Sequence, residues 1–203
     1  MNSRRRVARE AARLLYLGLA EEFIQAKEMA AQALGVDAFP SNYEVALELD
    51  QIADEEEGME RKRLLIRLRE EALRVMRILE GFNPRLIGSV WRGTARRGSD
   101  IDIVVYASEP NEVEERLLEA GLAPDGEDLV TLKEGKPINS RHIKLRLESG
   151  SEVEVVVRPP DSSNIHERCD IYGDLKRGLG IQELEEVLNR DPLRVFIPRR
   201  RRD

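Results

Sequence analysis

The chain has 203 residues, of which 41% are hydrophobic and 35% are charged, and its formal net charge is −6. This apolar share is enough for one or two packed domains and excludes a mainly disordered chain. The acidic balance excludes nucleic-acid binding through bulk charge, so any such binding would need a local basic patch.

The first eighty residues have the spacing of amphipathic helices, with apolar residues three and four positions apart. Ser41 and Glu44 have the spacing of a capping box, which predicts a helix start there. Gly58 is expected to interrupt the helical pattern. We expect four helices: one that ends at Gly18, one over Ala20–Leu34, one that begins at Ser41 and one over Met59–Glu80.

The fourth expected helix is rich in arginine and glutamate, and its polar face has two interpretations. Its arginines are Arg61, Arg63, Arg67, Arg69, Arg74 and Arg77. They form either a surface for RNA or, with the interleaved glutamates, a solvated and salt-bridged face. The sequence leaves both interpretations open.

After Gly81 the pattern changes to short strands that alternate with turns. Two runs that alternate apolar and polar residues, His142–Leu147 and Glu152–Val157, are joined across a Ser-Gly turn and predict an antiparallel hairpin. The other expected elements are strands over Arg85–Ile87, Asp100–Tyr106 and Leu129–Leu132, and helices over Asn111–Ala120 and Ile181–Asn189.

These elements divide the chain into a helical N-terminal region, 1–80, an α/β unit, 81–160, and a helical C-terminal segment, 161–203, with the basic tail Arg199–Arg202. Cys169 is the only cysteine, which excludes an intrachain disulfide and fits a reducing compartment. No apolar run approaches the roughly 20 residues that span a bilayer. We therefore expect a cytoplasmic protein that does not bind membranes.

Two aspartates stand two residues apart in a strand that is otherwise apolar. Because side chains alternate along a strand, Asp100 and Asp102 share one face, whereas Ile101 and Ile103 share the other. Two carboxylates about 7 Å apart on one strand face repel each other unless a cation lies between them. Carboxylate oxygens suit Mg²⁺ or Mn²⁺. The pair predicts a divalent-metal site, with a solvated edge strand as the alternative.

The turn that precedes these aspartates has the composition of a phosphate site. Gly88 follows a short strand and lets backbone N–H groups approach a phosphate, while the hydroxyl of Ser89 adds a donor. Arg92 follows in the connecting segment, and arginine is suited to bidentate contacts with phosphate. Alone, the Gly-Ser pair would fit an ordinary strand-to-helix turn; beside the aspartates it predicts a phosphate site.

Two-metal phosphoryl chemistry needs a third carboxylate on a neighbouring strand. In the second hairpin strand, Glu152 and Glu154 share the face opposite the valines. Glu154 is the preferred candidate because it lies further into the strand, and Glu152, beside the turn, is the alternative. His142, at the start of the first hairpin strand, is interpreted as a surface residue.

The order of these motifs resembles the DNA polymerase β-type nucleotidyltransferase superfamily. Gly88–Thr94 reads GSVWRGT and Asp100–Ile103 reads DIDI, which is similar to archaeal CCA-adding enzymes and to minimal nucleotidyltransferase domains. The resemblance covers about residues 84–158, and the helical segment before it is similar to a group of archaeal proteins that carry this domain. It implies an α+β fold: a polymerase β-like mixed sheet with helices on one face, preceded by an N-terminal helical segment.

Carried over residue by residue, the resemblance implies a role for each candidate. The implied nucleotide-binding residues are Gly88, Ser89 and Arg92. The implied catalytic residues, which are also the implied metal ligands, are Asp100, Asp102 and Glu154. Glu154 stands where the family more often has aspartate, and it would ligate the catalytic metal and align an acceptor hydroxyl.

The resulting hypothesis is a nucleotidyltransferase that uses Mg²⁺ or Mn²⁺. It would move a nucleoside monophosphate from an NTP, with ATP expected, to an acceptor hydroxyl and release pyrophosphate. RNA, a protein and a small molecule all stay open as the acceptor. Two alternatives remain: a non-catalytic nucleotide-binding regulatory module, and an antitoxin-like partner protein whose helical first segment binds a toxin.

Overall fold

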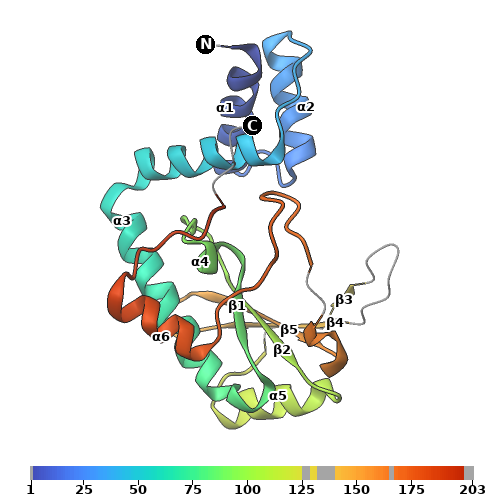
Figure 1. The fold of residues 1–203 in the computed structure, drawn as a ribbon, viewed down its shortest axis with the longest axis vertical. Helices are drawn as coiled ribbons and strands as arrows, with labels where there is room; N and C mark the ends of the chain where they lie inside the picture. The colour runs from blue at the N-terminus through green and yellow to red at the C-terminus, as the bar shows by residue number, and fades with distance from the viewer. Residues whose placement is uncertain (1, 125–128, 132–139, 165–166, 199–203) are drawn as a thin grey trace. The chain divides into compact units, whose positions relative to one another are not determined.

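The computed structural model describes residues 2–124, 129–131, 140–164 and 167–198. The chain forms two compact units, which are composed of Met1–Arg61, Arg168–Asp174 and Pro198–Asp203, and of Lys62–Glu167 and Leu175–Ile197 (Figure 1). Within the described ranges, no helix is both long enough and apolar enough to cross a membrane. The predicted domain boundaries stay a prediction, and the basic tail Arg199–Arg202 lies outside the described residues.

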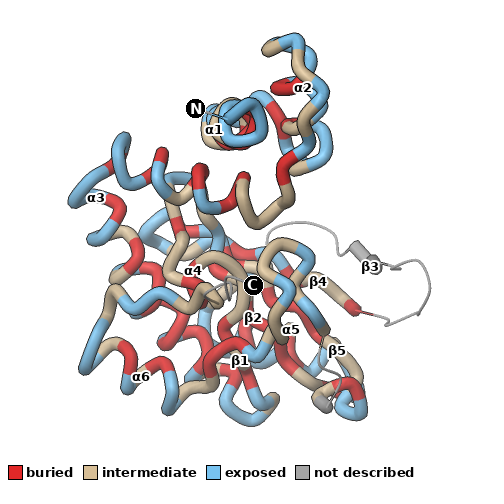
Figure 2. Tube along the Cα trace, turned by 45° about the horizontal axis from the view of Figure 1, so that its top comes forward, coloured by how far each residue is buried: buried red, intermediate tan, exposed pale blue. Residues whose placement is uncertain are grey.

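The first unit is helical, as the sequence predicts. Its elements are α1 (Ser3–Tyr16), α2 (Phe23–Leu34) and the first part of α3 (Asn42–Ile78). Buried and exposed positions alternate along α1 with helical spacing (Figure 2). The buried residues are mostly small: Val7, Ala8, Ala11, Ala12, Ala26, Ala30 and Val45 are almost fully covered. Side chains of this size let helices approach closely at small cost in side-chain entropy.

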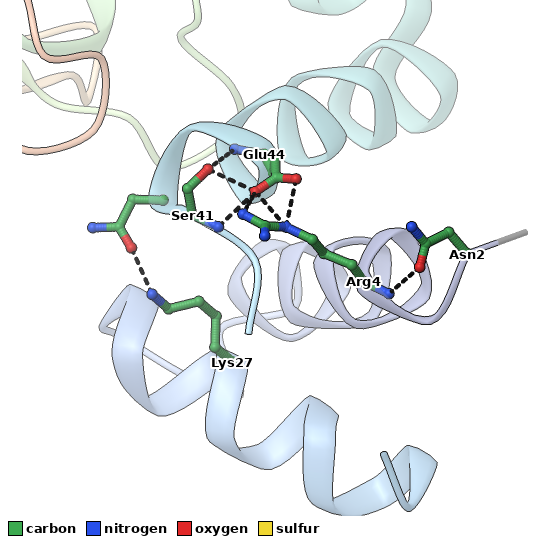
Figure 3. Close-up of polar contacts among 6 residues, drawn as sticks. Asn2, Arg4, Lys27, Ser41 and Glu44 are labelled. Atoms are coloured by element: carbon green, nitrogen blue, oxygen red, sulfur yellow. Dashed lines mark hydrogen bonds and ion pairs between the residues drawn. The ribbon is translucent and has the colours of Figure 1, made fainter. Parts of the chain in front are cut away.

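A capping box fixes the start of α3, as the Ser41 and Glu44 spacing predicts (Figure 3). Glu44 Oε2 accepts from the Ser41 backbone N–H at 2.7 Å, and the Glu44 N–H donates to Ser41 Oγ at 3.3 Å. Arg4 on α1 donates to the same carboxylate at 2.7 Å. The hydrogen bond from Arg4 is the largest of the effects that lower the pKa of Glu44 to about 2. The box therefore joins α1 to the beginning of α3.

Gly58 interrupts α3, as expected, because its φ of 52° and ψ of −125° are not helical. Arg61, which is buried, spans the interruption: its guanidinium donates to the Asp50 carbonyl at 3.0 Å and to Asp54 Oδ1 at 2.6 Å. Arg61 is thus committed to the fold and does not belong to an exposed arginine surface.

The second unit contains a mixed sheet of five strands, with the order β1-β2-β5-β4-β3. The strands are β1 (Arg85–Ile87), β2 (Ile101–Tyr106), β3 (Leu129–Thr131), β4 (Ser140–Arg146) and β5 (Glu152–Arg158). β2 and β5 are parallel, and the other pairs are antiparallel. The predicted β4–β5 hairpin is confirmed, and so is the predicted α+β fold.

The helices of this unit lie against one face of the sheet. They are the second part of α3, α4 (Gly88–Arg92), α5 (Pro110–Glu119) and α6 (Ile181–Arg190), with the short 3-10 turns η1 (Glu80–Phe82) and η2 (Pro160–Asn164). Ile101, Ile103 and Val155 are fully buried in the same core as Leu68, Leu117 and Leu184 of these helices. The alternate positions, which include Asp102 and Glu154, lie on the opposite face.

Arg69 on α3 is fully buried and connects the helices to the C-terminal part of the unit. Its guanidinium donates to the Val90 and Trp91 carbonyls of α4 at 3.1 and 3.0 Å. It also donates to the Pro192 and Arg194 carbonyls at 2.7 and 2.8 Å. Burial lowers the pKa of Arg69 to about 10, so the side chain is still charged at neutral pH. Four carbonyls therefore depend on one buried cation, which cannot at the same time bind RNA.

We expect Arg69→Met to destabilise the second unit by on the order of 3 kcal/mol, because it leaves buried carbonyls without donors. The measurement is urea unfolding followed by fluorescence of Trp91, the single tryptophan, which is buried in this unit. Arg67→Met is the matched control, since Arg67 is exposed on the same helix. Equal midpoints for the two variants would contradict the assigned role of Arg69.

Candidate active site

Three carboxylates gather at the start of β2 and β5. Asp102 on β2 is in register with Glu154 on the parallel neighbour β5. Asp100, which is exposed, immediately precedes β2. Asp100 and Glu154 line the same surface depression of about 170 Å³, to which Lys144 of β4 also contributes. The structure thus brings together the three acidic residues that the sequence singles out.

Gly88 lies directly against the Asp102 carboxylate. Its φ is +69°, a conformation that residues with a Cβ rarely adopt. A Cβ built at this position would lie 1.8 Å from Asp102 Oδ2, well inside van der Waals contact. Only glycine allows this approach, so the turn at 88 and the carboxylate at 102 form one local structure. Ser89 follows in the first turn of α4.

Negative charge is concentrated at Asp102. Burial and, to a lesser extent, the negative charges of Asp100 and Glu154 together raise the pKa of this carboxyl to about 7. Carboxyl groups whose pKa is raised close to neutral pH are common at sites where a cation or a proton has a function. The residues of the site therefore have a surplus of negative charge that a bound cation would balance.

The donor set fits a hard divalent cation. It consists of carboxylate oxygens, which Mg²⁺ and Mn²⁺ prefer. Among the described residues, however, no three His, Cys, Asp or Glu side chains are arranged as a ready metal cage. Mg²⁺ in proteins is usually held by one or two carboxylates, and water and substrate phosphates complete its coordination. The arrangement fits an ion that binds together with a phosphate ligand.

Glu154 is held by a residue that the sequence interpretation placed on the surface. Its Oε1 lies 3.2 Å from His142 Nδ1, and the other ring nitrogen, Nε2, lies 3.2 Å from Ser140 Oγ. The interpretation of His142 as a plain surface residue is therefore wrong. The alternation of β4 puts Ser140 and His142 on one face, but it does not give the diagonal contact with Glu154.

Arg92 makes its contacts elsewhere in the unit. It is buried, its Nη1 donates to the Phe196 carbonyl at 2.8 Å, and its guanidinium carbon lies 4.0 Å from the centroid of the Trp91 ring. In return, the Phe196 N–H donates to the Arg92 carbonyl at 2.8 Å. These contacts attach α4 to the C-terminal segment, and a phosphate contact of Arg92 stays a prediction.

Residues 69–169 match the model of the nucleotidyltransferase domain family. The matched part, just under half of the chain, carries the three carboxylates and the Gly88 turn. A comparison with curated proteins gives no match.

Solved structures that resemble the chain include a variant of the Cid1 poly(U) polymerase bound to MgATP and a cytoplasmic RNA terminal U-transferase. For the first, identity is 19%, coverage is 46% of this chain and 32% of that chain, and the TM-score is 0.34. For the second, identity is 21%, coverage is 57% of this chain and 34% of that chain, and the TM-score is 0.30. The match spans about a third of the length of each of these proteins.

The contact between Gly88 and Asp102 is tested by a pair of glycine variants. Gly88 and Gly98 both have positive φ, but a Cβ at Gly98 would meet nothing within 4 Å. Both alanine variants should lose on the order of 1 kcal/mol from backbone strain. Gly88→Ala should lose at least about 1 kcal/mol more, because the methyl group displaces a buried carboxylate. Equal unfolding midpoints in urea would mean that Asp102 moves away freely.

Because the carboxylates are crowded, we predict that Asp102→Asn stabilises the protein in metal-free buffer by an amount that depends on pH. The pKa of Asp102 is about 7 in the folded protein against an ordinary 3.8, so the charged carboxylate costs stability increasingly as the pH rises from 3.8 through 7. At pH 8 with EDTA, the free energy of unfolding of the variant should exceed that of the parent by on the order of 2 kcal/mol. The difference should shrink at pH 4, and a gain that is equal at both pH values would contradict this account.

Proposed function

We propose that the protein is a metal-dependent nucleotidyltransferase that transfers a nucleoside monophosphate from an NTP to an acceptor hydroxyl. The acceptor oxygen attacks the α-phosphorus, the bond from that phosphorus to the bridging oxygen breaks, and pyrophosphate leaves. The observation that carries this proposal is the juxtaposition of the Gly88 turn with Asp102, which is itself in register with Glu154. The family match of this segment supports it.

We assign the carboxylates as follows. Asp100 and Asp102 would hold Mg²⁺ or Mn²⁺, and Glu154 would complete the site and accept the proton of the acceptor hydroxyl. When bound, such an ion would neutralise charge on the phosphates and on the attacking and leaving oxygens. The carboxylates would fix where the ion binds, and the half-buried positions of Asp102 and Glu154 strengthen their electrostatic interactions relative to water.

Gly88 and Ser89 would bind the phosphates of the nucleotide. The absence of a Cβ at Gly88 gives a ligand access to the backbone next to Asp102. The Ser89 hydroxyl would add a donor on the same turn. Arg92, given its contacts with Trp91 and Phe196, would act by keeping α4 in place.

The acceptor and the place of action remain expectations. ATP is the expected nucleotide, and an RNA end, a protein side chain and a small molecule are the classes of acceptor to test. RNA would have to bind without Arg61 and Arg69, which are both committed to internal contacts. We expect the protein to act in the cytoplasm.

One observation favours a second candidate, a nucleotide-binding regulatory module without turnover. Glu154 contacts His142, and no three-residue metal cage exists among the residues that the structure describes. Such a module would bind NTP with Mn²⁺ but release no pyrophosphate with any acceptor. An antitoxin-like role would instead show as a tight protein partner that co-purifies with the chain.

The test combines labelling from [α-³²P]ATP in a lysate with pyrophosphate release by the purified protein. Asp100→Asn with Asp102→Asn should abolish Mn²⁺-dependent ATP binding and reduce transfer by at least 10²-fold, because the ion loses its ligands. Glu154→Gln should keep ATP binding but reduce transfer by a similar factor.

Glu152→Gln is the matched control, since it removes a carboxylate two positions away on the same strand face. If Glu152→Gln stops transfer and Glu154→Gln does not, the third carboxylate is Glu152. If the double aspartate variant transfers at the parental rate, the proposed function at this site is wrong.

A further inference from the structure

Ser140, His142 and Glu154 form a connected chain of side chains on the face of the sheet opposite the helix-covered core. Ser140 Oγ lies 3.2 Å from His142 Nε2, and His142 Nδ1 lies 3.2 Å from Glu154 Oε1. Ser140 and His142 lie on β4, and Glu154 lies on β5. Ser140 is buried at 9% exposure, so the hydroxyl end of the chain is fixed in the fold.

The contacts determine how the histidine ring is used. An ionised carboxylate only accepts hydrogen bonds, so the ring nitrogen that faces Glu154, Nδ1, must carry the hydrogen. In the neutral ring with this tautomer, Nε2 is an acceptor to which the Ser140 hydroxyl can donate. Serine thus orients the ring, and the ring in turn donates to one oxygen of the glutamate.

The pairing is selective, because Glu154 has a charged neighbour that it does not use. Lys144 is its direct cross-strand partner in the β4–β5 register, whereas His142 lies opposite Val156. Opposite charges that face each other across two strands usually attract. Glu154 nevertheless contacts the diagonal histidine, and no ion pair of Lys144 is found among the described residues. The carboxylate is therefore held in a specific orientation.

That orientation leaves part of the carboxylate available to the site. The contact with His142 runs through Oε1 of Glu154, and Glu154 also lines the depression of about 170 Å³ that it shares with Asp100. Carboxylates that ligate metals are typically held by hydrogen bonds from a second layer of residues, which fix their direction.

We propose that His142 is the positioning residue of Glu154 and that Ser140 fixes the orientation of its ring. This inference rests on the proposed function and names a part of the same site that neither the motif nor the family match assigns. His142 does not touch the nucleotide or the acceptor; it acts by holding Glu154 where it can serve both the ion and the acceptor hydroxyl. Replacing His142 should let the Glu154 carboxylate change its orientation while the carboxylate itself is kept.

The experiment measures Mn²⁺ binding by electron paramagnetic resonance in the presence of α,β-methylene-ATP, together with kcat and KM for pyrophosphate release. His142→Leu should weaken Mn²⁺ binding about 10-fold and lower kcat by a similar factor. KM for ATP should stay within about 2-fold, because the phosphate turn is intact. Ser140→Ala should weaken Mn²⁺ binding and lower kcat by smaller factors. His142→Gln, which keeps a hydrogen-bond donor, should retain more Mn²⁺ binding and kcat than His142→Leu.

Arg141→Leu is the structural control. Arg141 lies on the same strand and pairs with Asn111 and, at 2.6 Å, with Glu114 on α5, so its loss perturbs β4 without touching Glu154. It should lower the unfolding midpoint but leave Mn²⁺ binding within about 2-fold. Circular dichroism of each variant confirms that the sheet is folded.

The outcomes separate this inference from the proposed function. If Glu154→Gln loses transfer while His142→Leu retains parental Mn²⁺ binding and kcat, the positioning role is wrong and the proposed function stands. A loss of Mn²⁺ binding in Arg141→Leu as large as in His142→Leu would reduce the effect to general destabilisation and overturn the inference. If the parent protein neither binds Mn²⁺ nor releases pyrophosphate, both proposals fall.

Discussion

The candidate site depends on the close approach of the Gly88 backbone to the Asp102 carboxylate. The approach requires a residue without a Cβ at the turn and a strand that presents Asp102 on the face opposite the core. The register then sets Glu154 beside Asp102 without any further device, since β2 and β5 are parallel neighbours. The consequence is a group of like charges whose mutual repulsion and burial raise the pKa of Asp102 to about 7. A site of this kind is more stable with a cation than without one.

The turn keeps its place through residues that are distant from it in the sequence. Arg69 of α3 and Arg92 of α4 both bind carbonyls of the segment that follows α6. The carbonyls of Val90 and Trp91, immediately after the Gly-Ser pair, also accept from Arg69. Because a buried arginine without its acceptors is costly, loss of these carbonyl contacts would destabilise the unit. The helical part of the unit therefore determines how rigidly the backbone at Gly88 faces Asp102.

Sequence periodicity was sufficient for most of the longer elements and for the shared face of Asp102 and Glu154, because both follow from local alternation. Asp102 and Glu154 are half-buried on one face, and Ile101, Ile103 and Val155 are buried on the other. Arginine directions were not predictable, since a long side chain can reach solvent or the interior from the same Cα. Arg69 and Arg92 are buried, although the sequence pattern also allowed them to lie on an exposed face. His142 was missed because its partner lies diagonally across the hairpin, and a diagonal contact depends on twist and rotamer as well as on register.

The choice of histidine over lysine as the partner of Glu154 has an electrostatic reason. An ammonium paired with this carboxylate would neutralise the charge that a divalent ion needs and would compete for the same oxygens. A histidine can fix one oxygen through a hydrogen bond without having to carry a charge, so the negative charge of the glutamate remains directed at the site. Lys144, which is exposed beside the depression, then adds positive potential near the carboxylates without occupying them. In the proposed site, the hairpin would thus separate two tasks that a single basic residue could not perform together: orienting Glu154 and attracting an anionic ligand.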